Sequence, residues 1–162
     1  SSIVQFNLEN RNAIVSASSS GIGFAAAKLL LTEKCNVTIL SSNEKKLYNA
    51  KSELEKLNSG KVNAVVCDIN NLEHIQNAVS SAENAFGPTD ILVNNCGGPA
   101  PGFFDEIDDI KWSAGFDQVL MSSVRFNRLV LPGMKSNNWG RIINVTSISV
   151  KQPIDNLLLS NA

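Results

Sequence analysis

Three consecutive serines and two spaced glycines lie within Ser16–Gly23, directly after a short β-branched run. Together with Ala26, the stretch from Gly21 fits the pattern G-x-G-x-x-G/A, whose glycines allow a tight strand-to-helix turn and a close approach of phosphate to the backbone. Free N–H groups and partial positive charge at the helix N-terminus would then hold a pyrophosphate. The alternative is a strand-to-helix turn without a ligand. The strand before it and the helical pattern after it favour a phosphate cradle. The residues expected to line the cradle are Ala17, Ser19, Ser20, Gly21, Ile22 and Gly23.

Polar or small residues also stand at the ends of four later apolar runs. These residues are Ser41-Ser42, Asp68-Ile69, Asn94–Gly98 and Thr146-Ser147. In a parallel sheet the carboxyl ends of the strands meet at one edge, and such sheets bind ligands there. The residues expected to face a bound nucleotide at this edge are Ser41, Ser42, Asp68, Ile69, Asn94 and Gly97.

Short apolar runs alternate with longer amphipathic ones, which predicts strands alternating with helices. Strands are expected over residues 12–16, 35–40, 62–67, 90–94 and 140–146, and helices from residue 22 and over 44–57, 72–86 and 107–134. Leu29 and Leu30 are expected on the buried face of the first helix, and Leu72 on that of the third. Gly115 and Pro132 are expected to interrupt the last helix. The alternation predicts an α/β fold with a Rossmann-like, doubly wound parallel sheet.

The composition is that of an ordinary globular domain, and it disfavours several classes of protein. The 162 residues include 14 basic and 15 acidic side chains, a net charge of −1 that gives no basic surface for nucleic acid. No apolar run approaches the ~18 residues of a membrane span, and the first residues lack the pattern of a signal peptide. Cys35, Cys67 and Cys96 lack the spacing of a disulfide framework or a metal site, so no metal is expected and the thiols are expected to be free. A cytoplasmic protein is expected.

These motifs together resemble the short-chain dehydrogenase/reductase family, in the branch of the 3-oxoacyl carrier-protein reductases. Ser16–Gly23 stands in place of T-G-x-x-x-G-x-G, and Asp68-Ile69 in place of the aspartate-aliphatic pair that holds adenine. Asn94–Gly97 resembles N-N-A-G, and Trp112 and Gly140–Ser147 also fall where the family has similar residues. The resemblance implies a nicotinamide cofactor and hydride transfer to or from a small-molecule carbonyl or secondary alcohol.

The resemblance fails at most of the catalytic positions. Ser147 matches the family serine that holds the substrate oxygen, but the family's spacing places the proton-donating tyrosine at Ser160. The lysine would fall beyond Ala162, and leucine occupies the helix asparagine position near Leu120. A serine hydroxyl is a much weaker acid than a phenol, so Ser160 cannot simply replace tyrosine. Ser147 and Ser160 are the candidate catalytic residues.

Two explanations of these differences remain open. An insertion could misalign Ser160 with the family tyrosine, or the chain could belong to a divergent branch with altered chemistry or none. The alternative functions are therefore a nucleotide-binding regulator or assembly subunit, and a lyase or isomerase on the same fold.

The cofactor is expected to be NADP, with NAD as the alternative. An acid at the end of the second strand would bond the adenosine ribose diol and favour NAD, but Ser41 and Ser42 stand there. Their hydroxyls, with Ser19, Ser20 and a nearby lysine, could accept a 2′-phosphate.

The resemblance also bears on size and assembly. The chain, a single dinucleotide-binding domain over residues 1–162, stops where the family's last long helix would begin. We therefore expect the sheet to be incomplete at the C-terminus and the C-terminal third of the usual fold to be absent. Family members form tetramers or dimers through the helices corresponding to residues 112–134 and to those after Ser160, which implies a homo-oligomer.

Overall fold

The computed structural model describes residues 6–162, in which helices and strands alternate along the chain. In chain order they are β1 (Asn12–Val15), α1 (Gly21–Thr32), β2 (Asn36–Ser41), α2 (Glu44–Glu55), β3 (Val62–Val66), α3 (Leu72–Phe86), β4 (Ile91–Asn94), η1 (Phe104–Glu106), α4 (Asp109–Phe116), η2 (Asp117–Met121), α5 (Ser122–Ser136), β5 (Arg141–Asn144), η3 (Ile148–Val150) and α6 (Leu158–Asn161). The expected strands and long helices are all present, with ends shifted by a few residues. None of the helices in this part of the chain is long and apolar enough to cross a bilayer.

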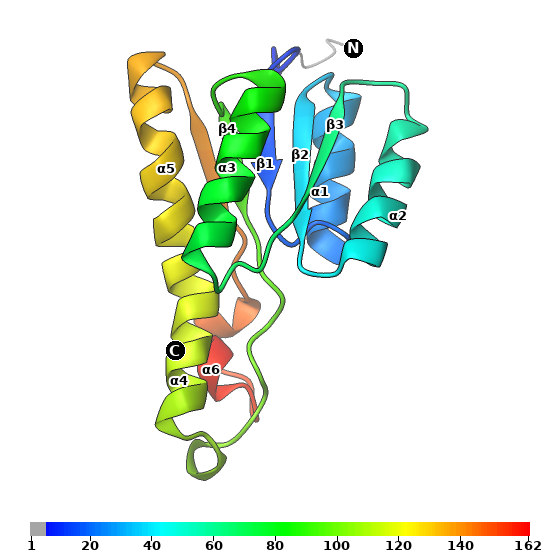
Figure 1. The fold of residues 1–162 in the computed structure, drawn as a ribbon. Coiled ribbons are helices and arrows are strands. Elements are labelled where there is room, and N and C mark those ends of the chain that lie inside the picture. Colours follow the sequence, from blue (N-terminus) through cyan, green and yellow to red (C-terminus); the bar gives the residue numbers. More distant parts are fainter. Residues whose placement is uncertain (1–5) are drawn as a thin grey trace, which may run out of the picture.

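The five strands form one parallel sheet in the order β3-β2-β1-β4-β5. After β3 the chain crosses to the other side of β1, so the strand order reverses between β1 and β4. The predicted doubly wound sheet is confirmed (Figure 1). Crevices at such a reversal point are where open α/β sheets bind ligands.

Helices cover both faces of the sheet because neighbouring residues of a strand point to opposite faces. On β1, Ala13 and Val15 face α1 and α2, whereas Ile14 faces α3 and α5. Leu31 and Leu47 are fully buried in the first of these cores, and Phe126 is 1% exposed in the second. The strands are therefore apolar on both sides, which explains why they read as continuous apolar runs.

Two expectations about helix faces are wrong. In α1 the buried residues are Gly23, Ala27 and Leu31, whereas Leu29 is 68% exposed. Gly23 lies against the preceding turn, so the buried face of α1 is the one that it shares with Ala27 and Leu31. Leu72 is 44% exposed because it is the first residue of α3, before the helix reaches the sheet.

The long helical stretch after β4 is interrupted next to one of the two expected positions, Gly115, and not at the other. Pro132 lies inside α5 without ending it. The regular helix instead gives way to one π-helical turn, η2, between α4 and α5. Gly115 has a packing role, since a Cβ there would lie 3.3 Å from the side chain of Leu159 in α6.

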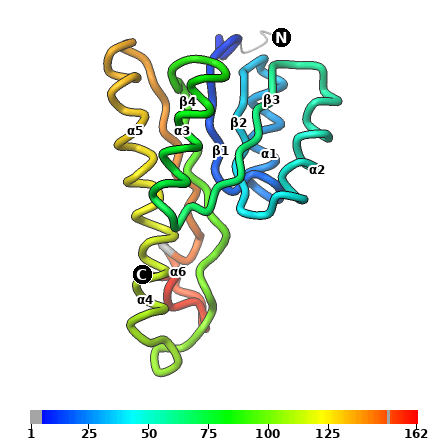
Figure 2. The backbone as a smooth tube through the Cα atoms, viewed as in Figure 1, coloured from blue at the N-terminus to red at the C-terminus, as the bar shows by residue number. Residues whose placement is uncertain are grey.

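The segments that follow β4 and β5 extend past the carboxyl edge of the sheet. Figures 1 and 2 show α4 and α6 side by side in this extension, and α4 continues through η2 into α5 beside the sheet. A parallel bridge between Gly102 and Leu157 joins the two segments. The extension forms one side of the region in which the candidate site lies.

Candidate functional site

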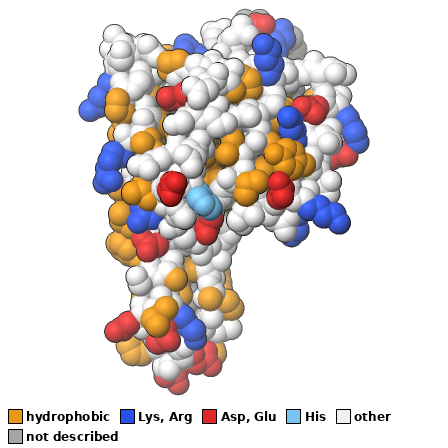
Figure 3. Space-filling model, in the orientation of Figure 1, with side chains coloured by type: hydrophobic (Ala, Val, Ile, Leu, Met, Phe, Trp, Pro, Cys, Tyr) orange, Lys and Arg blue, Asp and Glu red, His pale blue; other side chains and the backbone are white. Residues whose placement is uncertain are grey.

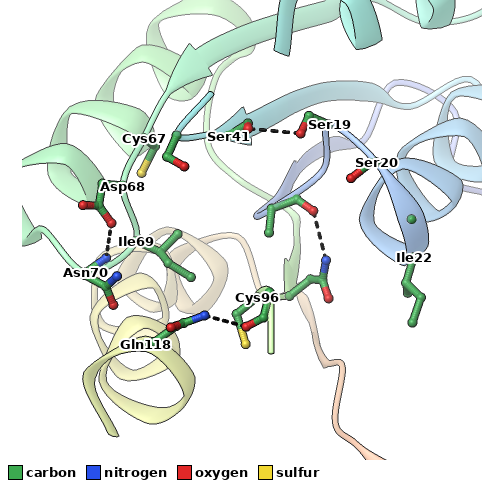
Figure 4. A pocket seen from close by; sticks show the side chains of 15 residues that line it. Ser19, Ser20, Ile22, Ser41, Cys67, Asp68, Ile69, Asn70, Cys96 and Gln118 are labelled. Carbon is green, nitrogen blue, oxygen red and sulfur yellow. Dashed lines mark hydrogen bonds between the residues drawn. The ribbon is translucent and has the colours of Figure 1, made fainter. Parts of the chain in front are cut away.

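A pocket of about 460 Å³ opens at the carboxyl edge of the sheet, where the turns after β1, β2, β3 and β4 meet. Its lining consists of Ala17, Ser19, Ser20, Gly21, Ile22, Ser41, Ser42, Cys67, Asp68, Ile69, Asn70, Asn95, Cys96, Gly97 and Gln118. Every residue expected to face a nucleotide is in this wall except Gly23 and Asn94. Figure 4 shows the serines on one side of the pocket and Cys96 with Gln118 on another.

The turn between β1 and α1 is tight because small residues allow close contacts within it. Gly21 has a φ of +58° and Ala17 a φ of +46°, the left-handed region that most side chains avoid. A Cβ on Gly23 would lie only 2.4 Å from the Ala17 carbonyl oxygen. Gly23 therefore lies under the turn, where it allows α1 to approach β1, and not in the wall of the pocket.

The serines of this turn have two different roles. The Ser18 hydroxyl donates to the Val15 carbonyl at 2.7 Å and accepts from the Leu40 N–H at 2.9 Å, so it ties β1 to β2. Ser16 ties the turn to the loop after β4 in the same way, through Asn95. Ser19 and Ser20 instead face the pocket.

Helix α1 begins at the pocket, with Gly21 and Ile22 in the wall. Ser20 is its N-cap residue, and within residues 6–162 the Ser20 side chain makes no capping hydrogen bond. The first N–H groups of a helix have no carbonyl partner within the helix, and they carry its partial positive charge. This end of the pocket can therefore hold an anionic group.

At the end of β2, serine hydroxyls stand where an acidic residue would favour NAD. The Ser19 hydroxyl donates to the Ser41 hydroxyl oxygen at 3.0 Å, and the N–H of Asn43 also donates to that oxygen, at 3.2 Å. Ser42 is exposed in the pocket wall. This part of the wall presents neutral donors to a ligand.

At the end of β3, the loop that carries Asp68 is held by hydrogen bonds on both sides. The Asn70 N–H donates to Oδ1 of Asp68 at 3.0 Å, and the Asp68 N–H donates to Nδ1 of His74 at 3.2 Å. The side chains of Asp68 and Ile69 are thereby placed in the pocket wall, as Figure 4 shows.

The two asparagines that end β4 point to different places. Asn94 is 5% exposed, and its Nδ2 donates at 2.9 Å to Oδ1 of both Asn127 and Asn144. It therefore joins β4 to α5 and β5 instead of lining the pocket. Asn95 was not among the expected residues, yet it lines the pocket and its Nδ2 donates to the Ala17 carbonyl at 3.0 Å.

The expected serines Ser147 and Ser160 lie outside the pocket wall. The Ser147 hydroxyl accepts from the Ser149 N–H at 3.1 Å, and the hydroxyls of Ser149 and Ser160 lie 3.3 Å apart. Ser149, which is 1% exposed, thus connects the two candidates. Tyr48 lies far along the chain from them, on α2, and is 48% exposed.

Of the wall residues that sequence reasoning missed, four directly flank expected ones. Cys67 and Asn70 flank the pair Asp68-Ile69, and Asn95 and Cys96 precede Gly97. Gln118 comes from η2, and nothing in its local sequence marks it. No cluster of three or more potential metal ligands occurs within residues 6–162.

All three cysteines are free thiols, and burial raises their pKa. Desolvation raises the pKa of Cys67 to about 12 and that of Cys35 to about 11, from the usual 9.0, with smaller contributions from nearby carboxylates. Burial also raises the pKa of Cys96, which lines the pocket. These thiols are therefore protonated, and poor nucleophiles, near neutral pH.

Raising the pH above 9 is expected to lower the free energy of unfolding. The unfolded chain loses its thiol protons from about pH 9, whereas folded Cys67 keeps its proton up to about pH 12. The contribution of each buried thiol to the free energy of unfolding is thus constant below pH 9. Above pH 9 it falls by about 1.4 kcal/mol per pH unit. Urea unfolding between pH 8 and 11 measures the free energy of unfolding of wild type and of Cys67→Ala, and it should fall less steeply in the variant. An equally steep fall in both proteins would contradict the role of Cys67.

Comparison with known proteins identifies the family. The model of the short chain dehydrogenase family matches residues 11–159. D-beta-hydroxybutyrate dehydrogenase of Cupriavidus necator is 34% identical over 141 residues, which cover 86% of this chain and 54% of that enzyme. The chain spans about half of the length of the curated relatives that it matches.

Solved structures of this fold are similar over almost the whole chain. L-sorbose reductase from Gluconobacter frateurii, complexed with NADPH and L-sorbose, matches with a TM-score of 0.93 and 30% identity, over 98% of this chain and 60% of that one. A variant of actinorhodin polyketide ketoreductase with NADPH has a TM-score of 0.88 and 29% identity, over 93% of this chain and 58% of that one. The family match over most of the residues, on a sheet of the same topology, means that this chain belongs to the short chain dehydrogenase family.

Proposed function

We propose that this chain is the cofactor-binding part of an oxidoreductase that uses NADP to transfer hydride to or from a carbonyl or secondary alcohol. The observation that carries the proposal is the pocket at the reversal point of the sheet, where the free N-terminus of α1 and four serines meet. The small residues of the β1–α1 turn fit a pyrophosphate, because they leave the backbone N–H groups accessible.

The residues of the pocket suggest how each part of the dinucleotide is held. The first N–H groups of α1 bind the pyrophosphate, and Asp68 with Ile69 bounds the adenine. The hydroxyls of Ser41 and Ser42 bind a 2′-phosphate. A carboxylate at the end of β2 would repel that phosphate, and serines stand there instead, which supports NADP over NAD.

The catalytic end of the site offers two serine hydroxyls. The nicotinamide, when bound, supplies or accepts the hydride. Ser147 would hold the substrate oxygen through its hydroxyl, and Ser160, connected to it through Ser149, would be the second hydroxyl near the reacting carbon. A serine hydroxyl is a much weaker general acid than a phenol, so neither group by itself replaces a tyrosine.

The relatives support the substrate class. Their names describe a hydroxybutyrate dehydrogenase, a sorbose reductase and a polyketide ketoreductase. Hydroxybutyrate named in this way is a secondary alcohol, sorbose is a ketose, and a ketoreductase is named for a ketone. We extend this class to the present chain, including the 3-oxoacyl compounds that its motifs suggest.

We also propose that the protein forms homo-oligomers through α4 and α5. Large apolar side chains are exposed on and between these helices, at Ile110 (78%), Phe116 (56%), Leu120 (48%) and Leu131 (38%). Figure 3 shows apolar side chains along this side of the molecule. Three free thiols agree with a reducing compartment such as the cytoplasm.

Titration with NADPH and NADH, followed by nicotinamide fluorescence and thermal shift, tests the proposed function. Saturable binding with a preference for NADPH is expected. Binding of neither nucleotide at millimolar concentration would refute the proposal. Oxidation of NADPH in the presence of a panel of ketones then tests hydride transfer, and tight binding without turnover would favour a nucleotide-binding protein that lacks redox activity.

A further inference from the structure

The loop after β4 has few packing contacts at Gly97 and Gly98, just beyond the hydrogen bonds that hold Asn95. A Cβ on Gly97 would have one neighbour within 4 Å outside its chain neighbours, Nε2 of Gln118 at 3.9 Å, and a Cβ on Gly98 would have none among the described residues. Both glycines are exposed. Packing alone therefore does not hold this part of the wall.

One side chain holds it instead. Nε2 of Gln118 donates to the carbonyl of Gly97 at 2.5 Å and lies 3.5 Å from that of Gly98. Figure 4 shows Gln118 reaching from its helix to this loop, with the hydrogen bond drawn. The two groups are 21 residues apart, so this contact ties the pocket wall to another element of the fold.

The helix that carries Gln118 is fixed in an unusual conformation at this point. Gln118 is the second residue of the π-helical turn η2, and such turns inside α-helices occur frequently at functional sites. The hydroxyl of Ser122, which is 5% exposed, donates to the Gln118 carbonyl at 2.6 Å. An ion pair at 3.3 Å between Asp117 and Arg125 spans the same turn. The backbone of Gln118 is thus held from two sides.

The strand order shows which half of a dinucleotide this wall would face. The phosphate cradle follows β1, and the residues for the adenosine half follow β2 and β3, on one side of β1. The loop of Gly97 follows β4, on the other side. A dinucleotide bound across the reversal point places its other half there.

We propose that Gln118 is a positioning residue, whose hydrogen bond to the Gly97 carbonyl holds the pocket wall beside the nicotinamide half of the bound cofactor. The proposal rests on the proposed function for the identity of the ligand. The tether itself depends only on the contacts of Gln118. Gln118 acts through the loop and does not take part in the chemistry.

The test compares Gln118→Leu with Gln76→Leu, the same change at an exposed position on α3. Leucine keeps the helix propensity and the size of the side chain but cannot donate a hydrogen bond. Gln118→Leu is expected to lower the NMR backbone order parameters of Gly97 and Gly98 from about 0.85 to below about 0.6, since the loop loses its tether. NADPH should bind about three- to tenfold more weakly, the loss expected for one hydrogen bond. Adenosine 2′,5′-bisphosphate, which lacks the nicotinamide half, should bind within about twofold of wild type. Gln76→Leu should change none of these.

The possible failures are distinguishable. Unchanged order parameters at Gly97 and Gly98 in Gln118→Leu would refute the tether, whether or not a nucleotide binds. Equal weakening of NADPH and adenosine 2′,5′-bisphosphate would refute the assignment to the nicotinamide half. Failure of wild type to bind either compound would refute the proposed function and the ligand role of Gln118 together, while the order parameters of Gly97 and Gly98 would still decide the tether.

Discussion

Replacing Gly23 with alanine is expected to abolish NADPH binding and to destabilise the fold. The added Cβ would lie 2.4 Å from the Ala17 carbonyl oxygen, 2.8 Å from Nδ2 of Asn95 and 2.9 Å from Cα of Ser18. Two of these three atoms belong to the backbone, so the β1–α1 turn itself must move. Overpacking of this kind costs roughly 3 kcal/mol, which corresponds to a fall in Tm of roughly 6–12 °C for a chain of this size.

The binding defect is expected because the turn and the first N–H groups of α1 form the proposed phosphate site. A shift of about 1 Å in α1 or the turn would misdirect those groups. Fluorescence titration and thermal unfolding measure the two effects. NADPH binding by Gly23→Ala with the affinity of wild type would mean that the cradle is not the phosphate site.

Gly60→Ala is the matched control for this variant. A Cβ on Gly60 would lie 1.9 Å from the Cys35 carbonyl oxygen, and its φ of +69° also disfavours alanine. Gly60 lies between α2 and β3, at the opposite edge of the sheet from the pocket. Loss of stability with unchanged NADPH affinity is therefore expected, measured below the melting temperature of the variant. An equal loss of affinity in both variants would mean that destabilisation alone explains the effect of Gly23→Ala.

Replacing Ser42 with arginine is expected to tighten NADPH binding about 10- to 100-fold. Ser42 is exposed in the pocket wall, so a long side chain can extend from it without displacing the core. A charge-assisted hydrogen bond from guanidinium to a 2′-phosphate contributes about 1.5–3 kcal/mol. The affinity for NADH, which has no 2′-phosphate, should change by less than about twofold.

The opposite charge at the same position is the control. Ser42→Glu is expected to weaken NADPH binding about tenfold and to leave NADH binding unchanged or tighter, because a carboxylate repels the phosphate and can accept from the ribose hydroxyls. Titrations at low and high salt should show the effect on NADPH shrinking as salt rises. Equal tightening of NADPH and NADH by arginine would show that Ser42 does not lie beside the 2′-phosphate.

Much of the fold could be predicted because its signals are local. The glycine turn at Gly21, the alternation of strands with helices and the polar residues after each strand depend on neighbours within a few residues. For the same reason, most residues of the pocket wall could be predicted from the ends of the strands. The resemblance to the short-chain dehydrogenases is confirmed, and it rests on these same short motifs.

The errors arose where a residue's role depends on a distant partner. Leu29 is exposed because the face of α1 that packs inward is that of Gly23, which lies beneath the turn, with Ala27 and Leu31. Asn94 turns away from the pocket because its amide bonds to Asn127 and Asn144, which lie 33 and 50 residues further along the chain.

The amino-acid sequence by itself determined the class of fold, the phosphate-type turn and the polar edge of the sheet, since propensity, periodicity and turn chemistry act over short distances. Only the tertiary structure decided which of those polar groups face one pocket. It brought Gln118 to the Gly97 carbonyl, and it left Ser147 and Ser160 outside the wall. The physical reason is that the strand order and the packing of α4 and α5 decide which groups meet. Neither the strand order nor this packing is encoded within a stretch of a few residues.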